Sequence, residues 1–284
     1  MNPLVSIVVP VRNDVRYIER CLQSIFSQSY RNIEVVIVDG ASTDGTLDIL
    51  RRYKAEYPER VCLVSEPDKG GGDAWNKGLK LAKGDFFGIL GSDDLYKPGA
   101  IGTVVDFFRS HPDAAFVHGS SENIDENGNV IFVHRVEPFD YHDFANTARH
   151  IDTTAAFYRR DVIEKIGWLD SSGDDFDVML RITREFVVYN IDRILSQLTI
   201  RKNSAYNSPA AFKDVKEQRR QTLSISRKYG GDILSPLALR YYAIAALDAL
   251  HLEFVYPHLK RFINFLHRTR RSRRSCGKDQ RTIA

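Results

Sequence analysis

Short apolar segments alternate with helical patterns through the first 110 residues, and this alternation limits the fold more than any other feature. The candidate strands cover residues 4–9, 33–38, 61–64 and 86–90. Because each is a nearly continuous apolar run, we expect a sheet that is covered on both faces. Strands that alternate with helices form right-handed βαβ units with parallel pairing. The spacing therefore predicts an α/β fold with a mostly parallel sheet flanked by helices.

Local signals predict where some of these elements begin and end. The first strand is expected to stop at Pro10, and Ser42 or Thr43 is placed to cap the helix after the second strand. Pro98 suits the first position of a later helix. Beyond Ala114 the pattern changes to closely spaced strand-like segments. These segments are residues 114–118, a hairpin over 123–133 around Asn127-Gly128, 153–158, 187–191 and 194–200.

Acidic residues follow two of the predicted strands and precede a later helix. Asp39 ends the second strand, Asp93 and Asp94 follow the fourth, and the run Asp174-Asp175-Phe176-Asp177 precedes a helix. Ligands of open α/β sheets bind at the carboxyl ends of the strands, so we expect these acids to meet at one edge. Mg²⁺ typically binds one or two carboxylates together with substrate phosphates. The pattern favours a metal-diphosphate site, although each acid alone also fits a solvated turn or a helix N-cap.

The charge of the chain is uneven. Residues 251–284 hold nine lysines and arginines against two acids, a net charge of +7, which leaves −4 for the rest because the whole chain carries +3. Apolar residues recur at helical spacing through 252–266, and four arginines follow in 270–274. This pattern fits a peripheral membrane contact through 252–274, and it also fits a helix packed on the main domain before a free basic end. No nucleic acid partner is expected, since aromatic residues are not interleaved with the arginines.

Other features predict a cytoplasmic protein. The sequence has no apolar run of 18 residues, and its start is typical of a strand and not of a signal peptide. The cysteines are Cys21, Cys62 and Cys276, an odd number without metal-type spacing, so we expect free thiols in a reducing compartment.

Several motifs in the same order as in one enzyme family are present. They are 10–13 (PVRN), 24–34 (SIFSQSYRNIE), 38–46 (VDGASTDGT), 65–70 (SEPDKG), 73–78 (DAWNKG), 84–85 (GD) and 92–94 (SDD). Together they resemble family 2 glycosyltransferases, in particular a bacterial branch that acts in surface-polysaccharide assembly. The resemblance implies a GT-A fold over residues 1–205 followed by a C-terminal helical region, 206–284. It also implies a nucleotide-sugar donor, with UDP favoured, a divalent metal (Mn²⁺ or Mg²⁺) and an inverting transfer to a hydroxyl of a glycan or lipid-linked acceptor.

The resemblance also assigns roles to individual residues. The implied donor-binding residues are Pro10, Val11, Arg12, Asp39, Asp68, Lys69, Asn76, Ser92 and Asp93. Asp93 and Asp94 match the family's metal and ribose carboxylates, and both are the implied metal ligands. Asp175 matches the general base, with Asp174 as the alternative.

The sequence departs from the family pattern in three places. Gly91 stands where many relatives have Asp or Asn, a His-containing motif near Thr153-Thr154 is absent, and glycines fill 70–72. Two other functions therefore stay open, a sugar nucleotidyltransferase and a non-catalytic nucleotide-sugar binder. The first normally needs a glycine-rich phosphate loop after strand one, which residues 10–14 do not provide. The sugar, the acceptor and the oligomeric state are not determined by the sequence.

Overall fold

The chain forms two compact units, which are described separately. The first consists of residues 1–137, 151–202 and 283–284, and the second of residues 138–150 and 203–282. The computed structural model describes residues 2–137, 139–147, 151–167, 175–201, 220–232, 235, 238–239 and 242–243. The predicted domain boundary at residue 205 lies outside these residues.

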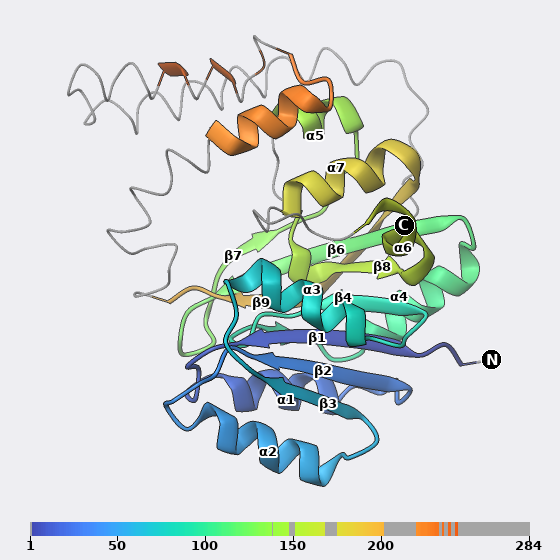
Figure 1. Cartoon of the computed structure of the whole chain (residues 1–284). Helices are drawn as coiled ribbons and strands as arrows, with labels where there is room; N and C mark the ends of the chain where they lie inside the picture. Colours follow the sequence, from blue (N-terminus) through green and yellow to red (C-terminus); the bar gives the residue numbers. More distant parts are fainter. Residues whose placement is uncertain are drawn as a thin grey trace. The chain divides into compact units, whose positions relative to one another are not determined.

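One sheet organises the first unit, and nine strands form it within the described residues (Figure 1). Its first half has the order β3 (Val61–Ser65), β2 (Ile33–Asp39), β1 (Val5–Val11) and β4 (Phe86–Ile89). All three pairings in this half are parallel. The predicted parallel βαβ arrangement is therefore confirmed for the segments from which it was inferred.

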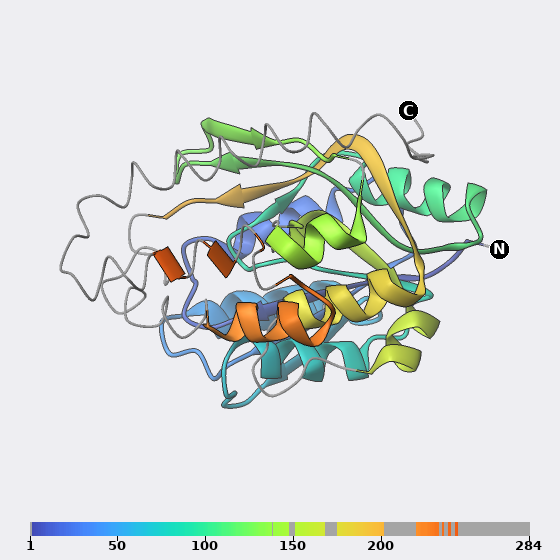
Figure 2. The same ribbon diagram turned by 90° about the horizontal axis from the view of Figure 1, so that it is seen from above.

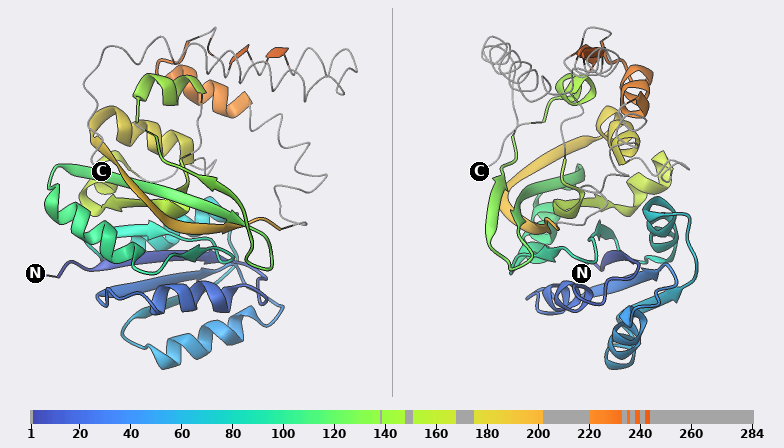
Figure 3. Two further views of the ribbon diagram at one scale, coloured as in Figure 1. Left: turned by 180° about the vertical axis from the view of Figure 1, so that it is seen from behind. Right: turned by 90° about the vertical axis from the view of Figure 1, so that its left-hand side faces the viewer.

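The second half of the sheet is mixed. Beyond β4 the order is β8 (Ala156–Arg159), β6 (Ala114–Ile124), β9 (Val187–Thr199) and β5 (Leu95–Tyr96), while β7 (Val130–His134) pairs with β6. β6 and β9 are parallel, and the other pairs are antiparallel. The predicted hairpin is β6–β7, because residues 125–129 are too few for the crossover that parallel strands need. The strands twist strongly from one end of the sheet to the other (Figure 3).

Helices cover both faces of the parallel half. α1 (Ile18–Phe26), α2 (Thr46–Glu56) and α4 (Ala100–Ser110) share a hydrophobic core with Ile7 and Val9 of β1. α3 (Gly71–Leu81) packs on the opposite face, where a Cβ added to Gly78 would lie 2.3 Å from Val8. Figure 2 shows α1 and α4 on one side of the sheet and α3 on the other. Both faces of the central strands are therefore buried, as their continuous apolar sequence predicts.

Elements of the second half complete the first unit. The short 3-10 helix Thr153–Ala155 precedes β8 where the sequence predicts continuous strand. α6 (Arg160–Ile166) follows β8 and ends at Gly167, as the sequence predicts. α7 (Asp175–Glu185) contacts α6 and leads into β9, a single strand where two segments were expected.

The expectation that the first strand stops at Pro10 is wrong. β1 continues to Val11, and Pro10 lies opposite Val38 of β2. Pro10 has the same orientation as Val8, whose carbonyl accepts a hydrogen bond from the Leu90 N–H (3.0 Å) next to β4. Since β4 pairs with β1 only as far as Val8, the missing N–H of Pro10 removes no hydrogen bond of the sheet.

The expected cap of α2 is also wrong. α2 begins after Gly45, whose φ of 97° is readily available to glycine, and no side chain caps its first turn from that position. Ser42 is engaged with Asp39 instead. Asp44 Oδ1 accepts a hydrogen bond from the Thr46 N–H (3.0 Å), so an acid just before the helix takes the role expected of a hydroxyl.

The second unit is described over a few helical residues. α5 (Tyr141–Thr147) is joined to the helical residues 220–228 by the Ser226 hydroxyl, which donates to the Ala145 carbonyl (2.6 Å). The Tyr141 hydroxyl donates to the Tyr229 carbonyl (2.9 Å). Within the described part of the chain, none of the helices has the length and apolarity needed to cross a membrane. The predicted membrane-contact segment 252–274 lies outside the described residues.

Candidate active site

Asp39 lies at the carboxyl end of β2 and is completely buried. Its Oδ2 accepts hydrogen bonds from the Ser42 N–H (3.1 Å) and from the Ser65 hydroxyl (2.6 Å), while Oδ1 accepts from the Ser42 hydroxyl. Neutral donors thus satisfy both carboxylate oxygens and fix the side chain in one orientation. Asp39 is a rigid part of this edge of the sheet.

Gly40 brings two other predicted donor-binding residues next to Asp39. A Cβ added at Gly40 would lie 2.4 Å from Asp68 Oδ2 and 3.2 Å from Arg12 Cδ. The Gly40 N–H also donates to the Val11 carbonyl (2.8 Å), which ties the end of β1 to the end of β2. Residues that are far apart in the sequence therefore converge where β2 ends, and a larger residue at position 40 would displace the Asp68 carboxyl group.

The other predicted donor-binding residues lie on β1 and around the loop after β3. Pro10 is half-buried on β1, Lys69 is exposed in the loop, and Asn76 is half-buried on α3. Asp68 Oδ1 accepts a hydrogen bond from the Gly70 N–H (2.9 Å), which shapes the loop just before α3. The structure gives these residues positions near one edge of the sheet, and their contacts with a donor stay predictions.

Asp93 and Asp94 follow β4 in an environment that differs from that of Asp39. Asp93 Oδ2 lies 2.6 Å from Arg201 Nε, and Asp94 Oδ1 accepts a hydrogen bond from the Thr199 N–H (2.9 Å). Burial, together with the neighbouring charge of Asp93, raises the pKa of Asp94 to about 8. Asp94 therefore holds a proton at neutral pH unless a cation stabilises its charged form.

Gly91 and Ser92 position this acidic pair. A Cβ added at Gly91 would lie 2.5 Å from Asp94 Oδ2, so a larger residue would displace the Asp94 carboxyl group. The Ser92 hydroxyl donates a hydrogen bond to Asp14 Oδ2. The glycine that departs from the family pattern thus leaves room for the carboxyl group three residues later.

Several residues of this site were missed by the sequence analysis. The Arg20 guanidinium donates through Nη2 to the Asp93 carbonyl (3.1 Å) and the Thr199 hydroxyl (2.6 Å). Arg201 Nη2 lies 2.8 Å from Asp14 Oδ2, and its guanidinium lies over the Tyr17 ring at 4.3 Å. No local signal marks the two arginines, because they reach Asp93 and Asp94 only through folding.

Asp152 is a further carboxylate that the sequence analysis did not select. It is buried, and its Oδ1 accepts hydrogen bonds from the Thr154 N–H (3.2 Å) and hydroxyl (2.8 Å). Its Oδ2 has no hydrogen-bond partner among the residues that the structure describes, and the charge of Asp152 contributes, after burial and Asp93, to raising the pKa of Asp94. Negative charge thus accumulates around Asp94 beyond what the local sequence shows.

The acidic pair fits a divalent cation that is shared with a substrate. Among the described residues, no group of three His, Cys, Asp or Glu side chains could hold a metal ion by itself. Asp93 and Asp94 nevertheless supply hard oxygen ligands, and the raised pKa of Asp94 shows that its negative charge is poorly compensated. Mg²⁺ commonly binds one or two carboxylates and completes its shell with phosphate oxygens and water. The chemistry of this pair fits that mode.

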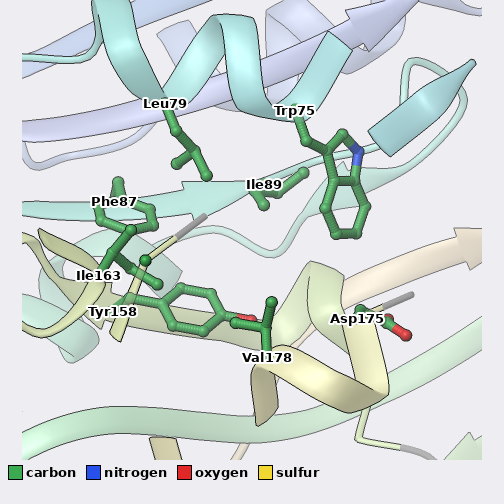
Figure 4. A pocket seen from close by; sticks show the side chains of 9 residues that line it. Trp75, Leu79, Phe87, Ile89, Tyr158, Ile163, Asp175 and Val178 are labelled. Atoms are coloured by element: carbon green, nitrogen blue, oxygen red, sulfur yellow. The ribbon is translucent and has the colours of Figure 1, made fainter. Parts of the chain in front are cut away.

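Asp175 is the first residue of α7 and lines a small pocket that is open to solvent (Figure 4). The pocket walls are mainly apolar and include Trp75 of α3, Ile89 of β4 and Tyr158 of β8. Burial, and then the charge of Asp175, raise the pKa of the Tyr158 hydroxyl. Asp175 thus shares this pocket with Ile89, the last residue of β4, whereas neither Asp93 nor Asp94 lines it. Asp174 lies outside the described residues.

The fold is that of GT-A glycosyltransferases. The chain aligns with a mannosyltransferase from Pyrobaculum calidifontis in complex with GDP-Man and Mn²⁺, with a TM-score of 0.58, 20% identity and coverage of 94% of this chain and 85% of that one. It also aligns with residues 1–349 of Staphylococcus aureus TarS in complex with UDP-GlcNAc, with a TM-score of 0.59, 21% identity and coverage of 84% and 71%. At these identities, the alignments show the fold alone.

Sequence comparison then defines the family. Residues 6–167 match the model of glycosyl transferase family 2, and the chain belongs to this family. It is 42% identical over 129 residues to chondroitin synthase of Escherichia coli, covering 45% of this chain and 19% of that protein. It is 35% identical over 170 residues to the PGL/p-HBAD biosynthesis glycosyltransferase of Mycobacterium bovis, covering 58% and 62%. The chain therefore spans less than two thirds of the length of either relative.

Proposed function

We propose that this protein transfers a sugar, with inversion, from a nucleotide-diphosphate sugar to a hydroxyl group of a glycan or lipid-linked acceptor. One observation carries the proposal: Asp39, Arg12 and Asp68 converge at the end of β2 on the same edge of the sheet where Asp93 and Asp94 follow β4. This edge is where open α/β sheets bind nucleotides. Family membership favours sugar transfer over nucleotidyl transfer.

The donor would lie across this edge. Asp39 and Arg12 would contact the nucleoside, and Asp93 and Asp94 would hold Mn²⁺ or Mg²⁺ together with the diphosphate. When bound, the cation supplies Lewis-acid stabilisation of the charge that builds on the leaving diphosphate. A UDP-sugar is favoured, and the UDP-GlcNAc bound to TarS and the GDP-Man and Mn²⁺ bound to the Pyrobaculum enzyme support a donor and metal of these classes.

Asp175 would act as the general base, with Asp174 as the alternative. Its carboxylate takes the proton of the acceptor hydroxyl while the hydroxyl oxygen bonds to the anomeric carbon. The bond from that carbon to the diphosphate breaks in the same step, and its electron pair leaves with the diphosphate. The position of Asp175 in a pocket beside the end of β4 supports this role.

Variants of these acids test the mechanism. Asp175→Asn is expected to lower turnover of nucleotide sugars with Mn²⁺ by about 10²–10⁴-fold, with donor affinity unchanged, because a positioned base contributes on that order. Asp161→Asn, on the surface of the neighbouring α6, is the control and should behave as wild type. Loss in Asp174→Asn alone would move the role to Asp174. If the wild type binds nucleotide sugars but neither transfers nor hydrolyses them, the protein is a non-catalytic binder.

We further propose that the protein acts in the cytoplasm, at the inner face of the plasma membrane, through residues 252–274. The basic cluster 270–274 supports this proposal, since each basic residue near an anionic leaflet contributes about 1 kcal/mol. Flotation with anionic liposomes should be lost when Arg270, Arg271, Arg273 and Arg274 become Ala. Replacement of the exposed Arg51 and Arg52 should not change flotation. Equal flotation of both variants and the wild type would contradict the contact.

A further inference from the structure

Arg201 lies between two carboxylates at the candidate cation site. Its Nε lies 2.6 Å from Asp93 Oδ2, and its Nη2 lies 2.8 Å from Asp14 Oδ2. The guanidinium also lies over the face of the Tyr17 ring, at 4.3 Å from the ring centroid. A positive charge of the protein itself therefore neutralises the carboxylate that is proposed to receive a divalent cation.

The two carboxylates that hold Arg201 differ in their freedom to change partners. The Asp14 side chain is 4% exposed, and its backbone carbonyl accepts the Tyr17 N–H (3.0 Å) and the Ile18 N–H (3.1 Å) at the start of α1. The Asp93 side chain is 24% exposed. Asp14 and Tyr17 thus form a fixed support for the guanidinium, whereas the Asp93 side chain is more accessible to solvent.

Hydrogen bonds other than the Arg201–Asp93 pair hold the surrounding chain in place. Arg20 donates to the Asp93 carbonyl and to the Thr199 hydroxyl, and the Thr199 hydroxyl itself donates to the Asp93 carbonyl. The Thr199 N–H donates to Asp94 Oδ1. The segment that precedes Arg201 is therefore anchored to the acidic pair by hydrogen bonds that do not involve the Arg201 side chain.

Arg201 and a divalent cation compete for the same oxygen. Divalent cations bind carboxylate oxygens at about 2.0–2.6 Å. Arg201 Nε lies 2.6 Å from Asp93 Oδ2, so it occupies space that a cation on this oxygen would need. Two positive groups this close repel each other unless further negative charge enters with the cation. A nucleoside diphosphate brings that charge, and a guanidinium binds phosphate oxygens through paired N–H groups.

We propose that Arg201 is a diphosphate-binding residue that is paired with Asp93 until the donor binds. Before the donor binds, Arg201 neutralises Asp93; when the cation takes Asp93, the guanidinium turns on its contacts with Asp14 and Tyr17 and pairs with the donor's diphosphate. This inference rests on the proposed function, because it requires a nucleoside diphosphate at the same site. It predicts that removing the positive charge of Arg201 has opposite effects on the two ligands.

Titration calorimetry of the full chain tests this prediction with Mn²⁺ alone and with UDP at saturating Mn²⁺. Arg201→Gln should bind Mn²⁺ alone about two- to fivefold more tightly, because a partly exposed competing ion pair is lost. The same variant should bind UDP at least about tenfold more weakly, since a charge-assisted contact with the diphosphate is lost. Arg201→Lys keeps the charge without the planar fork, so its Mn²⁺ affinity should stay near wild type while its UDP affinity falls. Arg52→Gln, which removes an exposed ion pair with Glu19, is the matched control.

The possible results separate this inference from the proposed function. Opposite shifts in Arg201→Gln support the inference, whereas weaker binding of both ligands in a folded variant would assign Arg201 a structural role and overturn it. Unchanged binding of both ligands would overturn it as well. If Arg201→Gln does not fold in a thermal melt, Arg201→Lys decides, and a UDP affinity equal to wild type overturns the inference. If the wild type binds neither UDP nor GDP with Mn²⁺, the proposed function itself fails.

Discussion

The ends of β2 and β4 both present buried aspartates at the same edge of the sheet, yet their surroundings are opposite. Asp39, at the end of β2, is satisfied by Ser42 and Ser65. Asp94, after β4, receives one backbone hydrogen bond from Thr199, and the charge of Asp93 adds to the effect of its burial. The first carboxylate is fully hydrogen-bonded within the protein, whereas the negative charge of the second is poorly compensated.

In the proposed function, the end of β2 is therefore a preorganised part of the donor site, whereas the end of β4 needs a bound cation to compensate its charge. Neutral donors around Asp39 fix it for recognition without a change on binding. Like charges and burial around Asp94 keep its carboxyl group protonated, and Arg201 compensates Asp93. Binding of a cation with a diphosphate would resolve both conditions together. The contrast predicts that equivalent substitutions at the two ends affect different properties.

The largest expected effect is on metal-dependent binding. Asp94→Ala should reduce the enhancement of UDP affinity by Mn²⁺ at least about a hundredfold, because metal stabilisation of diphosphate charge amounts to several kcal/mol. Asp39→Asn should keep the ratio of affinities with and without Mn²⁺, even if both affinities fall. Calorimetric titration of UDP in each condition measures the ratio. An undiminished ratio in Asp94→Ala would break the comparison.

The second largest effect is expected on the free energy of unfolding, for a substitution of Asp39 at the end of β2. Asp39→Ala leaves the Ser42 N–H and the Ser65 hydroxyl without their acceptor in the protein interior, which should lower the free energy of unfolding by about 2–3 kcal/mol. Urea denaturation of the full chain measures this loss. Asp94→Asn is the matched variant and should be no less stable than wild type at pH 7, since it removes a poorly compensated acid. A loss as large as that of Asp39→Ala would contradict this view.

The pH dependence of stability sharpens the same contrast. The pKa of Asp94 is raised to about 8 in the folded protein, so between about pH 4 and pH 8 the folded chain binds more protons than the unfolded chain. Stability should therefore fall as the pH rises through this range, by up to about 1.4 kcal/mol per pH unit. Asp94→Asn should remove this contribution. Melting temperatures of both proteins from pH 5 to pH 8 test it, and parallel curves would refute the shifted pKa.

The smallest expected effect concerns one donor to Asp39. Ser65→Ala removes the hydrogen bond of 2.6 Å to Oδ2 while the two contacts from Ser42 remain. The loss should be about 0.5–1.5 kcal/mol in the free energy of unfolding. Urea denaturation next to Asp39→Ala gives the comparison. A loss equal to that of Asp39→Ala would mean that Ser42 contributes nothing to holding this carboxylate.

Much of the fold could be predicted from local patterns. The apolar runs of β1, β2, β3 and β4 and the helices between them follow from period and burial, and their parallel pairing is confirmed. The mixed half could not be predicted in the same way. β8 precedes α6 in sequence but lies between β4 and β6, and such an order depends on pairing between distant segments.

Some residues of the candidate site could likewise be predicted from local sequence, and others could not. Asp39, Asp93, Asp94 and Asp175 could be selected because each lies at or shortly after the end of a strand, or at the start of a helix. Asp14, which follows β1 much as Asp93 follows β4, carries the same signal and was overlooked. Arg20, Asp152 and Arg201 could not be selected, since their sequence neighbours carry no corresponding signal. Gly40 shows the same limit: the glycine is visible in the sequence, but the side chains that need its space, Asp68 and Arg12, belong to other segments of the chain.

The sequence by itself determined the alternation of strands and helices, the acids at the strand ends and the resemblance to family 2 glycosyltransferases. These follow from periodicity and short motifs, which depend on neighbouring residues. Only the tertiary structure decided that Asp39 is satisfied by serines while Asp93 is paired with Arg201, 108 positions later in the chain. Charge compensation depends on distance in space, and folding alone brings these groups together.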